Sequence, residues 1–319
     1  MKIVIDAHIP FIAEAVRREW PHVDIYPLKP EEIDAEAIKN ADVLIVRTRT
    51  KVNEALLAGS KVQLVCTATI GFDHIDTAYC EAQGIHWMSC PGCNAQAVCD
   101  YIEEALNEIS ILQSPISNTP TIGVVGVGHV GSLVAQMAER KGLKVLLNDP
   151  PKHIGVSLDE IAQNCDIITF HVPLDSSTYH LCDEAFLAKC KPGALIINAA
   201  RGGVVDEQAL LHSRHPYILD TWENEPNINT EVLQKAALAS MHIAGYSVEG
   251  KRNASQMCLE AIAEQFNLPQ ISNLHSPISN KKGDSAPGWI SRISASLKAH
   301  PTSFEALRKS YPLREGSAR

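Results

Sequence analysis

Three ionisable side chains of different chemistry follow short, β-rich apolar runs in the second half of the sequence. Arg201 lies in the segment NAARGG, Glu225 in DTWENEP and His242 in HIAG. A histidine transfers a proton to or from an alcohol oxygen near neutral pH, and a carboxylate beside it orients the ring. An arginine binds a carboxylate through two hydrogen bonds and polarises the adjacent carbonyl. Each residue alone has an ordinary explanation as a loop or surface residue, but together they form a chemically sensible set.

A glycine-rich turn indicates a second kind of chemistry. The strand-like run TIGVV is followed by Gly126, Gly128 and Gly131 in G-x-G-x-x-G spacing, and then by a helical pattern. The first glycine permits a tight turn, the second lets the backbone approach a pyrophosphate, and the third lets helix and strand pack closely. His129 and Val130 fall at the start of this helix, whose N-terminus would face the anion. The turn therefore predicts a dinucleotide site.

An acidic residue supports the dinucleotide interpretation. Asp149 ends the next strand-like run, 18 residues beyond Gly131 (149 − 131). An acid near this position binds the ribose hydroxyls of the adenosine and would repel a 2′-phosphate, so the predicted cofactor is NAD rather than NADP. Lys152 can weaken that preference, and a plain turn residue before two prolines is the competing explanation of Asp149.

These residues require a fold that brings the ends of strands together. β-rich runs alternate with helical patterns over most of the 319 residues, which predicts parallel sheets covered by helices. We expect an α/β protein with two doubly wound parallel-sheet domains, a Rossmann-type NAD domain and a flavodoxin-like substrate domain. Ligands of open α/β sheets bind at the carboxyl ends of strands. Arg201, Glu225 and His242 are therefore expected to converge on one crevice.

Helical patterns and composition suggest the domain boundaries. A helical pattern begins after Asn94, a long one covers 247–268, and Pro, Ser, Asn and Lys dominate after Pro269. We expect residues 1–93 together with about 259–275 to form the substrate domain, since the long helix can return to it. Residues 94–258 would form the NAD domain, and 276–319 a short C-terminal tail.

Composition argues against several classes of protein. The formal net charge of −9 speaks against nucleic acid or an anionic membrane as the main partner, and no apolar run is long enough to span a bilayer. The nine cysteines are irregularly spaced, and the chain begins with a strand pattern instead of a signal peptide. We therefore expect reduced thiols and a cytoplasmic location. The spacing of cysteine and histidine predicts no metal site.

A pair of thiols offers a competing hypothesis. Cys90 and Cys93 form a C-x-x-C motif before a predicted helix, a context in which the pKa of a thiol falls and disulfide exchange becomes possible. This would indicate another class of oxidoreductase or a redox switch. The chain is far longer than a thioredoxin-like unit, which argues against the hypothesis.

The motifs, taken in their order along the chain, resemble the D-isomer-specific 2-hydroxyacid dehydrogenase family over about residues 1–268. They are the glycine turn with its later Asp, N-x-x-R-G, D-x-x-x-x-E-P and H-x-A-G. The resemblance implies that Arg201 binds the substrate carboxylate, that His242 is the acid–base, and that Glu225 is its partner.

The same resemblance implies the residues that contact the cofactor. Asp220 matches the family residue near the nicotinamide, and Gly245 is a further cofactor position. Val172 stands where a threonine is common in the family. A hydroxyl contact to NAD is therefore expected to be lost at Val172.

Further segments narrow the resemblance to one branch of the family. VRTRTKVNE, TATIGFDHID, PGCNA, NDPPK and the EGK that follows Tyr246 are similar to the branch that oxidises 4-phosphoerythronate in vitamin B6 biosynthesis. This implies a small phosphorylated hydroxyacid as substrate, with contacts from Thr48, Thr69 and Tyr246. Arg49, in a run of alternating basic residues, and Arg308, in the tail, are candidates for binding the phosphate. A solvated strand edge is the alternative explanation of the basic run.

The resemblance also implies a homodimer, although the tail is shorter than the dimerisation domain of better-known members. The segment Ser303–Tyr311 still resembles part of that domain. Two other functions stay open: a dehydrogenase of another D-2-hydroxyacid, and a non-catalytic protein that senses NAD. The presence of Arg201, Glu225 and His242 together argues against a sensor, which does not need a proton shuttle.

Overall fold

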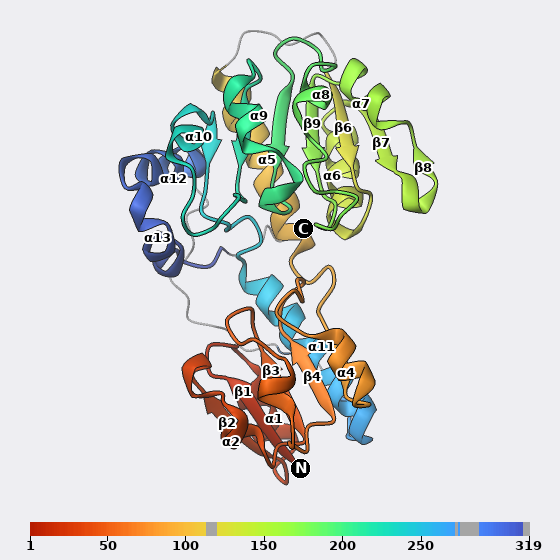
Figure 1. The fold of residues 1–319 in the computed structure, drawn as a ribbon, viewed down its shortest axis with the longest axis vertical. Helices are drawn as coiled ribbons and strands as arrows, with labels where there is room; N and C mark the ends of the chain where they lie inside the picture. Colours follow the sequence, from red (N-terminus) through yellow and green to blue (C-terminus); the bar gives the residue numbers. More distant parts are fainter. Residues whose placement is uncertain (113–119, 272–273, 275–286, 315–319) are drawn as a thin grey trace. The chain divides into compact units, whose positions relative to one another are not determined.

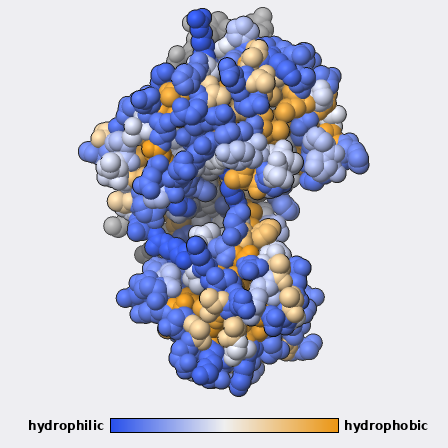
Figure 2. Space-filling view, viewed as in Figure 1, coloured by the Kyte–Doolittle hydropathy of each residue, from blue (hydrophilic) through white to orange (hydrophobic). Residues whose placement is uncertain are grey.

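The chain divides into two compact units, which are described separately. The computed structural model describes residues 1–112, 120–271, 274 and 287–314. The first unit comprises Met1–Asn94 with Ser247–Asn280, and the second Ala95–Tyr246 with Lys281–Arg319 (Figure 1). The visible face of each unit is mainly hydrophilic, with smaller hydrophobic patches (Figure 2). Among the described helices, none is long and apolar enough to cross a membrane.

A five-stranded parallel sheet forms the centre of the first unit, in the order β2-β1-β3-β4-β5. Its strands are β1 (Lys2–Asp6), β2 (Asp24–Leu28), β3 (Val43–Val46), β4 (Leu64–Thr67) and β5 (His86–Met88). This is the flavodoxin-like strand order. The predicted flavodoxin-like domain is therefore confirmed.

Helices cover both faces of this sheet because successive strand residues point to opposite sides. Ile3 and Ile45 belong to the core that includes α1 and α11, whereas Val4 and Leu44 belong to the core that includes α2, α3 and α4. The helical segments of the unit are α1 (Ile12–Glu19), the 3-10 turn η1 (Pro30–Glu32), α2 (Ala35–Ile38), α3 (Glu54–Leu57), α4 (Thr77–Ala82) and α11 (Val248–Phe266). Burial on both faces explains the continuous apolar runs in the strands.

A seven-stranded sheet forms the centre of the second unit, in the order β12-β11-β10-β9-β6-β7-β8. All its strands are parallel except β8, which pairs antiparallel with β7. The strands are β6 (Thr121–Val125), β7 (Lys144–Asp149), β8 (Ile154–Gly155), β9 (Ile167–Phe170), β10 (Leu195–Asn198), β11 (Tyr217–Leu219) and β12 (Leu238–Ala239). Chain order reverses between β6 and β9, which is where open α/β sheets bind ligands. The predicted Rossmann-type domain is confirmed.

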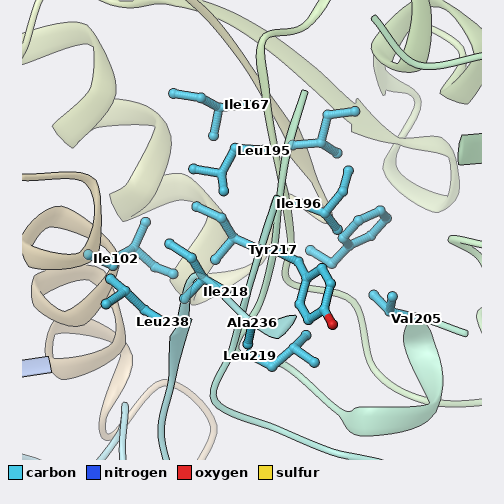
Figure 3. Packing of buried hydrophobic residues seen from close by; sticks show 14 of the residues in the cluster. Ile102, Ile167, Leu195, Ile196, Val205, Tyr217, Ile218, Leu219, Ala236 and Leu238 are labelled. Carbon is cyan, nitrogen blue, oxygen red and sulfur yellow. The ribbon is translucent and has the colours of Figure 1, made fainter. Parts of the chain in front are cut away.

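One large core supports the second sheet. Ile102 of α5 packs in the same cluster as Ile218 and Leu238 of the sheet (Figure 3). The helical segments of this unit are α5 (Ala95–Leu112), α6 (His129–Arg140), η2 (Pro150–Lys152), α7 (Leu158–Asn164), α8 (Glu184–Leu187), η3 (Gly202–Val204), α9 (Glu207–His212), α10 (Thr230–Lys235), α12 (Trp289–Ala299), η4 (Pro301–Ser303) and α13 (Phe304–Ser310). The core fixes the positions at which the strands end.

The second boundary between the units differs from the expected position at residue 258. All of α11 belongs to the first unit, which resumes at Ser247. The Ser247 hydroxyl accepts a hydrogen bond from the Gly250 amide and caps the helix. Cys258 and Ile262 then pack into the core beneath β1, β3 and β4. Because α11 packs into this core on both sides of residue 258, from Ala254 to Ala263, the helix cannot be divided there.

The C-terminal segment also differs from the separate tail expected at 276–319, of which 287–314 are described. Trp289, Ile290 and Phe304 belong to the core of the second unit. The Glu108 carboxylate in α5 accepts hydrogen bonds from the amides of Ile290 and Ser291 at the start of α12. Buried apolar residues and a capped helix make this segment part of the second unit.

Candidate active site

The glycine turn joins β6 to α6 in the geometry that the sequence predicts. Gly126 has φ of 89°, and a Cβ atom there would lie 2.8 Å from the His171 carbonyl and 2.9 Å from a methyl group of Val172. A Cβ atom on Gly131 would lie 1.9 Å from the Gly126 oxygen, whereas one on Gly128 would meet nothing within 4 Å. The first and third glycines therefore permit close packing, and Gly128 leaves space beside the helix N-terminus.

Asp149 stands at the end of β7, beside this turn. Its Oδ2 accepts a hydrogen bond of 2.8 Å from the Val127 amide, and the Lys152 ammonium lies 3.8 Å away. Lys152 also donates to the Val127 carbonyl at 2.7 Å. His129 and Val130 form the first turn of α6. The turn, the helix N-terminus and the carboxylate suit the pyrophosphate and ribose of a dinucleotide.

His242 and Glu225 form a hydrogen-bonded pair. The distance from His242 Nδ1 to Glu225 Oε2 is 2.8 Å, and the two side chains are 34% and 20% exposed. Glu225 Oε1 accepts a second hydrogen bond from the Trp222 amide at 2.9 Å, which fixes the carboxylate. When Nδ1 carries the proton that it donates to Glu225, Nε2 has its lone pair available as a base.

The ends of three neighbouring strands carry the predicted set. Arg201 follows β10, Glu225 follows β11 and His242 follows β12, and these strands lie side by side in the sheet. A Cβ atom on Gly202 would lie 2.0 Å from the Trp222 carbonyl, so the Arg201 turn packs directly on the turn that leads to Glu225. Arg201 Nη1 donates to the Ala200 carbonyl at 2.9 Å. The strand ends therefore place the three residues along one edge.

Asp220 holds the segment that carries His242. Its side chain is almost completely buried, and it accepts hydrogen bonds from the Ser240 hydroxyl and from the amides of Ile243 and Ala244. The structure thus gives Asp220 a supporting task that the sequence did not suggest. Its contact to the nicotinamide stays a prediction, as does that of Gly245, which follows in the same turn.

Two predicted substrate residues of the second unit contact each other. The Arg308 guanidinium lies over the Tyr246 ring, 5.7 Å from its centre, and Glu305 lies 3.7 Å from Arg308. A cation held over an aromatic ring is stabilised by the ring's negative face. The tail residue Arg308 is therefore beside Tyr246 within a single chain.

The remaining predicted substrate residues belong to the first unit. The Thr69 hydroxyl is 2.6 Å from that of Thr67 and donates to the Gly71 carbonyl at 2.9 Å. Thr48 and Arg49 are exposed after β3. Thr48 lines a pocket of about 510 Å³, formed with Lys51, Val52, Asn53, Asp73, His74, Ile75 and Asp76.

The basic run comprises Arg47, Arg49 and Lys51, and its first residue forms an ion pair within the first unit. Arg47 forms an ion pair of 2.8 Å with the buried Asp6 carboxylate. Burial alone would raise the pKa of Asp6, but hydrogen bonds from Arg47 and from the His8 amide lower it below its ordinary value. Burial lowers the pKa of Lys251, and the charge of Arg47 lowers it further. Lys251 is thus a cation near Arg47 that the sequence marked only as part of the EGK motif.

The cysteines do not behave as a redox pair in this structure. All nine are free and buried, and Cys90 Sγ lies 3.8 Å from the sulfur of Cys258. Burial raises the pKa of Cys93 to about 12, and the hydrogen bond with Cys258 and burial raise that of Cys90. Because the thiolate is the reactive form, these conditions disfavour disulfide exchange.

A cluster that the sequence did not suggest is formed by residues that follow β9, β10 and β11. His180, Asp206 and Glu223 bring one possible metal-ligand atom each within 4.8 Å of the others. His180 Nε2 is 2.8 Å from the Glu223 carboxylate, and the ring stacks on Tyr179. Neighbouring Glu207 accepts a hydrogen bond from the Glu223 amide, and burial raises the pKa of Glu207 to about 7.

Comparison with known proteins identifies the family. Residues 110–244 match the family model "D-isomer specific 2-hydroxyacid dehydrogenase, NAD binding domain". The chain is 44% identical to an erythronate-4-phosphate dehydrogenase of Bacteroides fragilis over 345 aligned positions, which cover all of this chain and 99% of that protein. The chain belongs to the D-isomer specific 2-hydroxyacid dehydrogenase family. The predicted family, the enzyme class and the NAD cofactor of this dehydrogenase are thereby confirmed.

Two further comparisons describe the extent of the similarity. An erythronate-4-phosphate dehydrogenase of Klebsiella pneumoniae is 39% identical to this chain over 285 aligned positions, which cover 85% of this chain and 75% of that protein. The NAD+-bound 3-phosphoglycerate dehydrogenase of Entamoeba histolytica is 26% identical, with a TM-score of 0.70 and coverage of 86% of this chain and 98% of that one. The dehydrogenase therefore shares the two-unit fold of a solved NAD complex.

Proposed function

We propose that the enzyme oxidises the C2 hydroxyl of 4-phospho-D-erythronate to (R)-3-hydroxy-2-oxo-4-phosphooxybutanoate with NAD+, a step of pyridoxal 5′-phosphate biosynthesis. The observation that carries the proposal is the 44% identity to the Bacteroides fragilis erythronate-4-phosphate dehydrogenase over essentially the full length of both chains. The hydrogen-bonded pair of His242 and Glu225 supports it chemically, because alcohol oxidation requires a base.

The chain's own residues supply the proton chemistry. His242 Nε2 accepts the proton of the C2 hydroxyl while the C2–H bond breaks and a carbonyl forms. The hydride from C2 would pass to NAD+, which supplies the oxidising chemistry when it is bound. The Glu225 carboxylate, 2.8 Å from His242 Nδ1, stabilises the imidazolium that results. Arg201 binds the substrate carboxylate and polarises the developing carbonyl.

The cofactor is assigned to the turn between β6 and α6. Gly126, Gly128 and Gly131 would hold the pyrophosphate against the first turn of α6, and Asp149 would bind the adenosine ribose. The space beside Gly128 supports this assignment. A methyl group of Val172 lies beside the turn at Gly126, so the side chain of Val172 would contact NAD through apolar atoms only.

A substrate panel tests the function. We expect NADH formation with 4-phosphoerythronate and at least about 100-fold lower kcat/KM with D-lactate, D-glycerate and 3-phosphoglycerate. D-lactate and D-glycerate lack the charged phosphate that the site would pair. In 3-phosphoglycerate one carbinol group is missing, so its phosphate and carboxylate cannot both reach the groups that bind them in 4-phosphoerythronate. Preference for one of the other acids would support a dehydrogenase of another D-2-hydroxyacid. NAD+ binding without turnover of any acid would indicate a sensor.

The phosphate is assigned to the basic residues near the substrate contacts. Thr48, Thr69 and Tyr246 are proposed to contact the substrate, with Arg49 and Arg308 as phosphate donors. The contact between Arg308 and Tyr246 supports the second candidate. Separate Arg49→Ala and Arg308→Ala variants should identify the donor through a KM for 4-phosphoerythronate raised about tenfold or more, the usual loss of one charge-assisted hydrogen bond. Arg17→Ala, on the exposed end of α1, is the control for a lost surface charge.

A homodimer in the cytoplasm completes the proposal. The nine buried free thiols agree with a reducing compartment. Light scattering coupled to size-exclusion chromatography should give twice the chain mass of 34.8 kDa, and a monomer mass would refute the dimer.

A further inference from the structure

Arg314 is a buried arginine whose hydrogen bonds converge on the segment after His242. It is 7% exposed, although it carries a guanidinium. Nη2 donates to the carbonyls of Ile243 and Ala244 and to that of Ala97, and Nε donates to the Tyr246 carbonyl. The Arg314 amide also donates to the Tyr246 carbonyl at 3.4 Å. Three of the four carbonyls thus belong to residues 243–246.

The opposite side of the same segment is held by a carboxylate. Asp220 accepts the amide hydrogens of Ile243 and Ala244, at 2.8 and 2.9 Å. Arg314 therefore holds the oxygen side of residues whose nitrogen side Asp220 holds. Peptide groups that are bonded on both sides to buried charged groups have little freedom to rotate.

His242 needs such support because its backbone is unusual. Its φ of 58° lies in the left-handed region, which a residue with a Cβ atom rarely adopts. Strained backbone of this kind persists only where surrounding contacts fix it. The His242 amide is bonded to the Asp220 carbonyl at 2.8 Å, and the residues that follow are held between Asp220 and Arg314.

Arg314 is itself fixed by the C-terminal helices. Its guanidinium lies over the Trp289 ring, 4.7 Å from the centre, and Trp289 packs edge-on against Tyr101 of α5. The Tyr101 hydroxyl is hydrogen-bonded to Ser240, which donates to Asp220. The arginine and the carboxylate are thus parts of one buried polar network around the end of β12.

We propose that Arg314 is a positioning residue that sets the His242 imidazole in line with Glu225 by fixing the carbonyls of Ile243, Ala244 and Tyr246. The proposal rests on the acid–base role of His242 in the proposed function. It assigns to the C-terminal segment a task in catalysis within its own chain. If Arg314 served packing alone, its replacement would lower the stability of the protein without a particular effect on turnover.

Kinetics of Arg314→Ala and Arg314→Lys test the proposal, with thermal unfolding measured for each. We expect kcat to fall about 10- to 100-fold, the usual cost of a small misplacement of a catalytic group, while KM for NAD+ stays within about twofold. Free guanidinium should restore part of the kcat of Arg314→Ala but not that of wild type. Arg314→Lys should remain impaired, because one ammonium cannot reach all the carbonyls.

A matched control separates positioning from stability. Lys298 of α12 donates to the Ala236 carbonyl at 2.5 Å, at the amino end of β12 rather than the end that carries His242. Lys298→Met should lower the unfolding temperature and leave kcat unchanged. An unchanged kcat in folded Arg314→Ala would overturn the proposal, as would an equal loss of kcat in Lys298→Met at equal loss of stability.

A measurement without substrate keeps this test separate from the proposed function. In protein with ¹⁵N-labelled histidine, the His242 Nδ1–H signal, assigned by its loss in His242→Gln, reports the hydrogen bond to Glu225. It should shift upfield and exchange faster in Arg314→Ala and stay as in wild type in Lys298→Met. If wild type does not oxidise 4-phosphoerythronate, the function fails, and this signal alone decides the role of Arg314. An unaltered signal would refute it.

Discussion

Replacing Gly131 by alanine should test whether the enzyme needs close packing of α6 on the glycine turn. A control variant at Gly128 tests NAD+ binding separately. The new Cβ atom would lie 1.9 Å from the Gly126 oxygen and 3.3 Å from a methyl group of Val124. An acceptable contact with that oxygen needs at least about 3 Å, so α6 and the glycine turn must separate by about 1 Å. Both obstacles are backbone or core atoms, so the strain cannot be relieved by a side-chain rotation.

The expected cost follows from two opposing effects. Overpacking of this kind costs about 3 kcal/mol, at the upper end of the usual range. Alanine in place of glycine in a helix recovers up to about 1 kcal/mol. The net loss of about 2 kcal/mol in the free energy of unfolding corresponds to a fall of roughly 4–8 °C in the unfolding temperature of this unit.

Gly128→Ala is the control, because a Cβ atom there meets nothing within 4 Å and φ is −85°. Its thermal unfolding without cofactor should match that of wild type, while calorimetry should show NAD+ affinity reduced about tenfold or more by the methyl group beside the pyrophosphate. Wild-type stability in Gly131→Ala would refute the packing argument. Wild-type NAD+ affinity in Gly128→Ala would refute the assigned pyrophosphate position.

Three further variants test the acidic and basic groups. His242→Ala should reduce kcat by ~10²–10⁴-fold, and near-normal turnover would exclude His242 as the base. Glu225→Gln should move the acid limb of the pH–rate profile for oxidation to lower pH, because the imidazolium loses its stabilising carboxylate; an unchanged profile would contradict the pairing. Glu207, whose pKa burial raises from 4.5 to about 7, keeps its proton in the folded state between these values while the unfolded chain releases it, so wild type loses stability as pH rises through that window. The free energy of unfolding of Glu207→Gln should therefore exceed that of wild type by up to about 3 kcal/mol at pH 8 and equal it near pH 4, as measured by thermal unfolding at both pH values. Equal stability of the two proteins at both pH values would show that burial does not raise the pKa of the Glu207 carboxyl.

Local patterns carried the prediction of the dinucleotide turn. Gly126, Gly131 and Asp149 belong to one strand–turn–helix–strand segment, so short-range sterics and strand direction decide where they lie. The 247–268 helix was predicted for the same reason, and its cap at Ser247 is a local hydrogen bond. Its division at residue 258 was wrong because periodicity indicates a buried face but not the sheet that buries it. The packing of Cys258 and Ile262 into the core of the first unit decides which sheet buries the helix.

The sequence by itself determined the family, the order of the motifs and the residues that follow each strand. The tertiary structure decided which of those residues interact. Glu225 is hydrogen-bonded to His242, and Arg47 forms an ion pair with Asp6. The Arg308 guanidinium lies over the Tyr246 ring. Nothing in the weakly patterned C-terminal segment indicated a role for Arg314, although its guanidinium donates a hydrogen bond to a carbonyl 71 residues away. A backbone pattern is repeated every few residues and can be read locally. The partner of a buried charge is fixed only when the packed core brings distant segments within hydrogen-bonding distance.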